Sequence, residues 1–380
     1  MKFIHTSDWH IGRQFHNVSL LEDQCYVLDQ IIAYIEQQSV DAVVISGDIY
    51  DRSVPPAAAV QVLDKYVDMI CSTLNVPIIM IPGNHDGAER LRFGSRQLSS
   101  SGLHILGDLT NITEPVVVSG LDTDVAFYGI PYNDPESVRN LFDVNVSNHD
   151  EAHGYLVDEI SSQLSADNCN VLLSHCFIDG SAETESERPL SIGGADRVSY
   201  EPCKIFDYVA LGHLHSPQYR GQESIRYSGS ILKYSFSEQH QRKGVTLVEL
   251  GKSGFVSCIH LPLTPMRDMR VIEGELDDII KSGKTDPGSD DYLLVRLTDK
   301  HAVLDPMGKL RVVYPNVLHL EKPGMYHSTD KLAHQEKMKR GELQMFRDFY
   351  SQVSGDTLSE SQDEIVRNVI EKLNRNSSQF

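Results

Sequence analysis

The residues of this chain that could do chemistry gather in five short segments, and each segment contains histidine, aspartate or asparagine. The segments hold Asp8 and His10, Asp48, Asn84, His175, and the pair His213 and His215. Imidazoles, carboxylates and an amide, with no thiolate among them, suit divalent ions such as Mn²⁺, Fe²⁺ or Zn²⁺. The sequence therefore predicts a metal centre built from these seven side chains.

Each segment directly follows an apolar run of the kind that forms a buried β-strand. The runs end at Thr6, Ser46, Ile81, Ser174 and Leu211. In Asp-x-His and His-x-His, alternate residues of an extended segment point the same way, so both side chains can face one site. Because ligands gather at the carboxyl ends of parallel strands, we expect the five segments to converge on one rim of a sheet.

A pair of divalent ions at this rim would attract a phosphodiester. Asp8 and Asp48 offset only half of the ions' charge, since histidine and asparagine are neutral ligands. Such ions lower the pKa of bound water and hold the attacking and leaving oxygens of a displacement. Asp48, in a middle segment of the series, is the natural bridge between the two ions. The predicted chemistry is metal-dependent hydrolysis of phosphoester bonds.

The elements that must position these segments alternate between strand and helix in the first hundred residues. Strands are expected at 2–6, 41–46 and 77–81, with two stretches of helical apolar spacing between them. This order predicts parallel strands with helices on the faces of the sheet. After residue 103 strands dominate around one helix near 150–164. We therefore expect an α/β (α+β) fold, a two-sheet sandwich flanked by helices.

Four parts are expected along the chain. They are a catalytic domain at 1–265, a small α+β module at 266–322, a polar linker at 323–340 and a helical tail at 341–380. The tail contains two short amphipathic helices, and the first carries Phe346, Phe349 and Tyr350 on its apolar face. Such helices either fold back on the body of the protein or dock into a groove of a partner. The intervening linker and the aromatic residues favour the partner.

The composition is that of a globular protein, with 40% hydrophobic and 23% charged residues in a chain of 380. No apolar stretch approaches the roughly 18–20 residues that span a bilayer. The first five residues run straight into the Asp8 segment, so we expect no signal peptide. The six cysteines form no CxxC pair, which favours reduced thiols and a cytoplasmic location.

The net charge of −20 restricts the possible partners. Nearly all of it lies in the first 328 residues. Binding to a nucleic-acid backbone requires a basic surface. If the protein acts on DNA, the metal ions or a partner must therefore supply much of the attraction.

The sequence motifs of these segments are similar to those of a known superfamily. The series DWH at 8–10, GDIYD at 47–51, GNHD at 83–86, SH at 174–175 and GHLH at 212–215 resembles the calcineurin-like metallophosphoesterases. Three longer stretches resemble one branch, the bacterial SbcD family of SbcCD nuclease subunits. These are HTSDWHIG at 5–12, SERPLSIGG at 186–194 and YSGSILKYSFSE at 227–238.

The resemblance implies a division of labour among the site residues. One ion, most simply Mn²⁺, would be held by Asp8, His10, Asp48 and His215, and a second by Asp48, Asn84, His175 and His213. His85 would be a catalytic histidine that binds no metal and assists the leaving oxygen. Asp51, the second aspartate of the GDxxD pattern, would orient His85, although a role in bracing its own loop explains Asp51 equally well.

The resemblance also implies a DNA nuclease subunit with 3′→5′ exonuclease activity on double-strand ends and endonuclease activity on hairpins, in DNA repair, recombination and replication. The module at 266–322 would serve in capping and DNA recognition, and the tail would bind an SbcC-like ATPase. The subunit would form a homodimer within a heterotetramer. One alternative is a stand-alone phosphodiesterase or phosphatase for small substrates, which the acidic charge favours. Another is a non-catalytic scaffold for SbcC, which the intact ligand set opposes.

Three features of the sequence have no catalytic role in this interpretation. His5 alternates out of phase with the Asp8 segment, so we interpret it as structural. Asp86, the last residue of GNHD, has no assigned role beyond bracing its loop. The polar stretch 183–197 has the length and glycine content of a functional loop.

Overall fold

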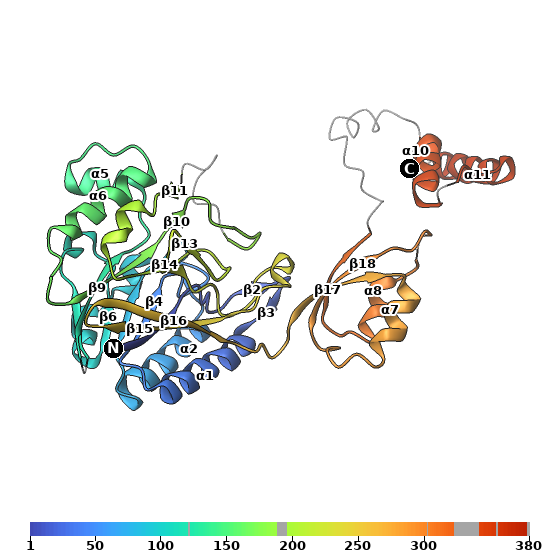
Figure 1. Cartoon of the computed structure of the whole chain (residues 1–380). Helices are drawn as coiled ribbons and strands as arrows, with labels where there is room; N and C mark the ends of the chain where they lie inside the picture. The colour runs from blue at the N-terminus through green and yellow to red at the C-terminus, as the bar shows by residue number, and fades with distance from the viewer. Residues whose placement is uncertain (121, 188–195, 302, 323–341, 355, 378–380) are drawn as a thin grey trace. The chain divides into compact units, whose positions relative to one another are not determined.

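The structure is a computed structural model that describes residues 1–120, 122–187, 196–301, 303–322, 342–354 and 356–377. The chain divides into two compact units, Met1–Asp268 and Met269–Phe380. The division falls close to position 265, where the two prolines end the β-rich region of the sequence. The linker expected at 323–340 lies outside the described residues. Figure 1 shows the elements of each unit.

One six-stranded sheet of the first unit carries the amino terminus. Its order is β16-β15-β1-β4-β5-β6, and the last four strands are parallel, whereas β15 and β16 run antiparallel. The strands are β1 (Lys2–Thr6), β4 (Ala42–Ser46), β5 (Ile78–Ile81), β6 (Leu103–Ile105), β15 (Gly244–Gly251) and β16 (Gly254–Pro262). The apolar runs thus form adjacent parallel strands whose carboxyl ends share one rim.

A second six-stranded sheet, in the order β13-β14-β12-β9-β8-β7, faces the first. Its four central strands are parallel, and an antiparallel strand closes each edge. The strands are β7 (Val116–Ser119), β8 (Asp124–Ile130), β9 (Cys169–His175), β12 (Tyr208–Gly212), β13 (Gln218–Arg220) and β14 (Gln222–Tyr227). Of the last two predicted ligand segments, one ends β9 with His175 and the other directly follows β12.

The core between the two sheets consists of side chains from both inner faces. Phe3 packs edge-on against Phe127 and Tyr208, with ring centroids 5.6 Å apart in each pair. The Ser46 hydroxyl at the end of β4 donates to the Ala210 carbonyl of β12 at 2.9 Å, so a hydrogen bond joins the sheets close to the rim. The expected two-sheet α/β sandwich is confirmed.

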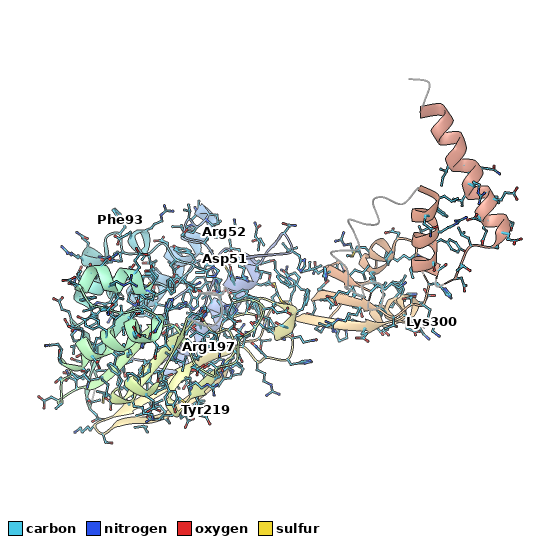
Figure 2. All side chains as sticks on the ribbon, turned by 90° about the horizontal axis from the view of Figure 1, so that it is seen from above. Asp51, Arg52, Phe93, Arg197, Tyr219 and Lys300 are labelled. Carbon is cyan, nitrogen blue, oxygen red and sulfur yellow. The ribbon has the colours of Figure 1, made fainter. Side chains whose placement is uncertain are left out.

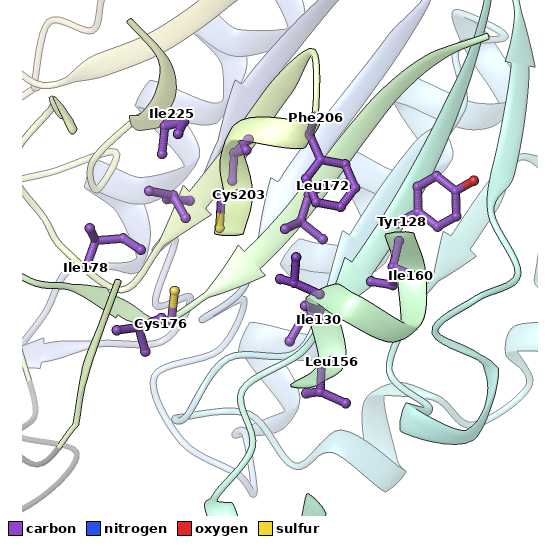
Figure 3. Close-up of a cluster of buried hydrophobic side chains, with 14 of the residues drawn as sticks. Tyr128, Ile130, Leu156, Ile160, Leu172, Cys176, Ile178, Cys203, Phe206 and Ile225 are labelled. Carbon is purple, nitrogen blue, oxygen red and sulfur yellow. The ribbon is translucent and has the colours of Figure 1, made fainter. Parts of the chain in front are cut away.

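Helices cover the outer faces. Figure 1 shows α1 (Leu21–Gln38) and α2 (Ala57–Asp68) along one side of the unit, and α5 (Pro135–Phe142) and α6 (His149–Ser161) on the other. In Figure 3, Leu156 and Ile160 of α6 lie over the outer face of the second sheet, where all the clustered side chains are buried. The helix expected near 150–164 is confirmed. No helix was expected at α5, which begins with Pro135 directly after the capping residue Asp134.

Shorter elements complete the first unit. They are β2 (Gln14–Phe15), β3 (Val18–Ser19), α3 (Ala88–Leu91), α4 (Ser95–Leu98), β10 (Phe177–Ile178), β11 (Arg197–Val198), a π-helical turn at Met69–Thr73 and 3₁₀ turns at Ser99–Ser101, Leu109–Asn111, Glu201–Ile205 and Phe236–Glu238. None of the helices in the described part of the chain is long and apolar enough to cross a membrane. All six cysteines are described, and none forms a disulfide.

The second unit contains a parallel three-stranded sheet and two helical segments. The sheet is β17 (Met269–Gly274), β18 (Tyr292–Leu297) and β19 (Val317–Glu321), and its core includes residues of α7 (Leu276–Gly283) and α8 (Pro306–Arg311). The tail forms α10 (Glu342–Ser354) and α11 (Glu360–Ser377). Of the aromatic face expected on α10, Phe346 is exposed, and the side chain of Phe349 lies outside the described residues.

His5 lies in β1 between the two sheets and is fully buried. Its Nε2 donates to the Leu211 carbonyl at 3.2 Å, because a carbonyl can only accept, and its Nδ1 accepts from the Tyr208 hydroxyl at 3.0 Å. Burial lowers the pKa of His5 from 6.5 to about 3. The ring therefore stays neutral in the folded protein and links the two sheets, as its structural interpretation requires.

This neutral histidine predicts a pH dependence of stability. The unfolded ring takes up a proton below pH 6.5, whereas the folded ring does so only below about pH 3, so stability falls as the pH drops through this window. His5→Gln keeps one donor and one acceptor but does not titrate. Between pH 7 and pH 5, in EDTA, the unfolding free energy of the wild type should fall by about 2 kcal/mol more than that of the variant. Equal pH slopes in urea titrations would contradict this role.

Candidate metal centre

The structure brings all seven predicted ligands together at the carboxyl ends of β1, β4, β5, β9 and β12. Ligand atoms lie within 4.8 Å of one another in a first set, Asp8, His10 and His215, and in a second set, Asp8, Asp48 and His175. A third such set contains His10, Asp51 and His85. The Asn84 side chain reaches the second set, with Oδ1 2.9 Å from His175 Nε2. The ring of His213 lies 5.5 Å from that of His175.

The loops that carry the ligands depart from ordinary backbone geometry. Asp8, His10 and Asp48 have φ angles of 52°, 46° and 50°, and His213 has a φ of 105°. Left-handed conformations are uncommon for residues with a side chain and concentrate at functional sites. The loops hold one another in place, since the Asp8 amide donates to Gly47 O at 3.1 Å and the His10 amide to Asp48 O at 2.9 Å. The left-handed backbone conformations of these residues thus direct their side chains toward one site.

The pair His10 and His215 has the geometry of two ligands of one ion. Their Nε2 atoms lie 3.1 Å apart, and both rings are buried. At a metal–nitrogen distance of about 2.1 Å, two nitrogens on one ion lie about 3.0–3.4 Å apart for bond angles from 90° to tetrahedral. The observed separation falls within this range.

His175 and Asn84 provide a second indication of a cation. His175 Nδ1 donates to the Ser46 carbonyl at 2.8 Å, so the neutral ring has no proton on Nε2. That nitrogen then faces Asn84 Oδ1 at 2.9 Å and Asp48 Oδ2 at 3.6 Å, which are both acceptors. Three acceptors at such distances repel one another unless a cation binds them.

The electrostatics of the site agree with this conclusion. Burial, and next the charge of Asp48, raises the pKa of Asp8 well above its usual value. Burial, and next the neighbouring histidines, lowers the pKa of His10 and His213 well below the usual value, and burial lowers that of His175. A buried carboxylate pair among neutral imidazoles lacks a positive charge. Divalent ions fit this donor set, which supplies the nitrogen and oxygen ligands that such ions prefer.

His85 lies beside the metal ligands, with its ring 4.7 Å from that of His10. Its Nδ1 donates to the main-chain carbonyl of Asp51 at 2.9 Å. The carboxylate of Asp51 instead contacts Arg13 at 3.0 Å and lies 3.7 Å from exposed Arg52, beside which Figure 2 shows it. The two residues are therefore in contact, and the backbone carbonyl of Asp51 makes the bond to His85.

Asp86 braces its own loop and also holds the neighbouring Asp48 loop. Its carboxylate accepts from the amides of Gly83 at 2.9 Å, Ile49 at 3.0 Å and Tyr50 at 2.9 Å. Burial, and next the charge of Asp48, raises its pKa to about 7, against the effect of these amides. Asp86 joins the Asn84 loop to the Asp48 loop. In the sequence, the only indication of this role was the position of an aspartate three residues after Gly83.

Two glycines allow the loops to approach this closely. A Cβ atom on Gly83 would lie 2.2 Å from Asp48 Oδ1, and one on Gly212 would lie 1.8 Å from the Ser46 carbonyl oxygen. Real Cβ atoms do not come so close to other heavy atoms. Gly83 therefore makes room for the Asp48 carboxylate, and Gly212 makes room for the Ser46 carbonyl, which accepts from His175 Nδ1.

Comparisons with known proteins agree with the geometry. The model of the calcineurin-like phosphoesterase family matches residues 1–217, and the model described as the type 5 capsule protein repressor C-terminal domain matches residues 265–354. The chain is 36% identical over 371 residues to the SbcD subunit of the SbcCD nuclease of Staphylococcus epidermidis, and the match covers 97% of this chain and 98% of that relative.

Two solved structures have weaker similarity. A dimetal phosphatase from Danio rerio matches with a TM-score of 0.41 and 13% identity, over 70% of this chain and 99% of that chain. Yfce, a phosphoesterase from E. coli, matches with a TM-score of 0.27 and 12% identity, over 68% of this chain and 99% of that chain. These scores are too low to add to the assignment.

The sandwich and the family match define an enzyme that hydrolyses phosphoester bonds. The chain belongs to the calcineurin-like phosphoesterase family and, within it, to the SbcD family. This family membership agrees with the resemblance found in the motifs.

The close approach of Gly83 to Asp48 predicts a loss of metal binding in Gly83→Ala, because the added methyl group must displace the Asp48 carboxylate. Affinity for Mn²⁺, measured by calorimetry, should weaken at least about 10-fold. Gly154→Ala is the matched control, since a Cβ there meets nothing within 4 Å. It lies inside α6, where alanine stabilises by about 0.5–1 kcal/mol. Unchanged Mn²⁺ affinity in a folded Gly83→Ala protein would overturn this prediction.

Proposed function

We propose that this chain is the metal-dependent nuclease subunit of an SbcCD-like complex and cleaves DNA phosphodiester bonds. Its activities would be a 3′→5′ exonuclease on double-strand ends and an endonuclease on hairpins, in DNA repair, recombination and replication. The similarity to a nuclease subunit over 97% of the chain carries the proposal, because it extends well beyond the phosphoesterase region. The site at the rim supports the chemistry.

The ligand set divides naturally between two ions. Asp8, His10, Asp48 and His215 would hold one ion, and Asp48, Asn84, His175 and His213 the other, with Mn²⁺ as the proposed metal. When bound, the ions would polarise the phosphoryl group and lower the pKa of water. The protein's part is to fix the ligands: the Ser46 carbonyl holds the His175 proton on Nδ1, and the His213 amide donates to the Asp8 carboxylate at 3.1 Å.

His85 is the proposed proton donor to the leaving oxygen. The Asp51 carbonyl accepts from Nδ1 at 2.9 Å and so fixes the orientation of the ring. Because that bond keeps a proton on Nδ1, Nε2 can donate only when the ring is doubly protonated. Asp51 would support catalysis through its carbonyl, while its carboxylate holds Arg13. General acid catalysis of this kind contributes about 10²–10⁴-fold to a rate.

His85→Ala tests this role. With Mn²⁺ and the SbcC-like partner and ATP present, cleavage of hairpin DNA should fall about 10²–10⁴-fold, because the proton donor is lost. Mn²⁺ binding should stay unchanged, because His85 is not a ligand in this proposal. Loss of a bound ion in the variant would instead make His85 a ligand, an alternative raised by its proximity to His10 and Asp51.

A stand-alone phosphodiesterase for small substrates is the second candidate, and the net charge of −20 favours it. The same assay separates the two functions if it includes bis-p-nitrophenyl phosphate. Turnover of this small ester without DNA cleavage, even with the partner and ATP added, would favour the second candidate. A non-catalytic scaffold would turn over neither substrate.

The proposed partner is an SbcC-like ATPase that binds the helices of the tail. Arg347 of α10 forms a two-bond ion pair with Asp363 of α11, at 2.5 and 2.6 Å, which joins the two helices. Apolar side chains of this pair, Phe346, Ile365 and Val369, are exposed. Exposed apolar residues on paired helices suit a helix-in-groove contact. The partner would also supply the DNA affinity that an acidic chain lacks.

Deletion of residues 341–380 should abolish co-purification with the ATPase, because the whole helix pair is removed. Mn²⁺ affinity and hydrolysis of bis-p-nitrophenyl phosphate should persist, since every proposed ligand precedes residue 216. Co-purification of the truncated chain at the level of the full chain would rule out the tail as the docking segment. Assembly as a homodimer within a heterotetramer, and a cytoplasmic location, are further parts of this proposal.

A further inference from the structure

A buried ion pair lies directly behind the proposed metal ligand His215. Lys243 at the end of the turn before β15 contacts the carboxylate of Glu238, with Nζ 2.6 Å from Oε2. The two side chains are 4% and 0% exposed. Breaking a buried pair of this kind is costly, and keeping one is rarely needed for stability alone. Stability alone therefore does not explain why this ion pair lies behind His215.

The second oxygen of Glu238 points toward the metal centre. Glu238 Oε1 accepts from the hydroxyl of Ser186, and Ser186 Oγ lies 2.5 Å from His215 Nδ1. A hydroxyl has one proton, and the carboxylate can only accept it, so Ser186 Oγ must accept from His215 Nδ1. The proton of the neutral imidazole is thereby held on Nδ1. Its Nε2, which faces His10 at 3.1 Å, keeps its lone pair for the ion.

The same residues fix the main chain of His215. The amide of His215 donates to Glu187 Oε1 at 2.8 Å, and its carbonyl accepts from Lys243 Nζ at 2.7 Å. Lys243 also donates to Ser230 at 2.9 Å. The ring, the amide and the carbonyl of one ligand are therefore all bound by buried or half-buried side chains.

We propose that Lys243, Glu238 and Ser186 form a positioning relay that holds His215 in the metal-binding tautomer and orientation. The relay gives a role to two stretches that contain no proposed metal ligand. Ser186 belongs to SERPLSIGG at 186–194, and Glu238 belongs to YSGSILKYSFSE at 227–238. A carboxylate behind a ligating histidine fixes its tautomer and strengthens it as a ligand. Here a serine hydroxyl transmits that effect across one additional bond. The inference rests on the proposed role of His215 in binding metal.

Ser186→Ala and Glu238→Gln test the relay, with Mn²⁺ as the probe and the full chain as the protein. Each variant should weaken one of the two Mn²⁺ sites by about 10–100-fold and leave the other unchanged. The double variant should weaken it no more than the stronger single variant, because both residues act through the same bond. Ser186→Thr keeps the hydroxyl and should keep most of the affinity.

Ser235→Ala is the matched control. Ser235 is also a buried serine of the 227–238 stretch, but its hydroxyl contacts Ser237 and not Glu238, Ser186 or His215. Its Mn²⁺ affinities should equal those of the wild type. Thermal unfolding in EDTA accompanies each titration, since a purely structural residue would lower the unfolding temperature without selecting one metal site. Glu238→Gln/Lys243→Met removes both charges and shows whether an unpaired Lys243 causes the effect.

The outcomes separate the relay from the function on which it rests. If His215→Ala loses one Mn²⁺ site while Ser186→Ala and Glu238→Gln keep both at wild-type affinity, the relay is wrong and the metal centre stands. If His215→Ala also keeps both sites, the proposed role of His215 is itself wrong. Additive losses of Mn²⁺ affinity in the double variant would show that Ser186 and Glu238 do not act through one shared bond.

Discussion

The structure depends on a charge imbalance at the rim where the two sheets meet. Asp8 and Asp48 are buried within one site, beside His10 and His213, whose pKa values burial lowers. Without a cation this arrangement is unfavourable, since each buried carboxylate raises the energy of the other. The strained left-handed angles of Asp8, His10 and Asp48 add to the cost. The sandwich must supply enough packing to hold this site together before an ion binds.

The sandwich meets this demand by joining its sheets near the site. Ser46 bonds to Ala210, Gly212 approaches the Ser46 carbonyl, and the His213 amide donates to Asp8. These contacts link β4 and the end of β1 to the end of β12. A small shift between the sheets would therefore move ligands of both proposed ions at once. The contacts that hold the two sheets rigidly together therefore also fix the geometry of the site.

Sequence patterns predicted the sandwich and grouped the seven ligands because both depend on local features. A short apolar run marks a strand, and polar residues directly after it lie at its carboxyl end. The contacts of Asp51, Asp86, Ser186 and Glu238 had no such signal. Each is set by the direction of a side chain across a loop, or by a partner distant in sequence: Ser186 and Glu238 are 52 positions apart. The motif stretches containing these two residues indicated the family branch but not the contact.

The order of the strands has a consequence for how the protein is made. β15 lies beside β1, with Lys2 opposite Glu249, and the His213 amide bonds to Asp8 across 205 positions. A chain still emerging from the ribosome has its first ligands exposed long before their partners exist. The ligand set can be completed only after His215 has left the exit tunnel, and the first sheet only after β15 has followed it. Metal binding by the complete set is thus a late event in biogenesis, and a product truncated before β15 would leave β1 with β4 as its one neighbouring strand.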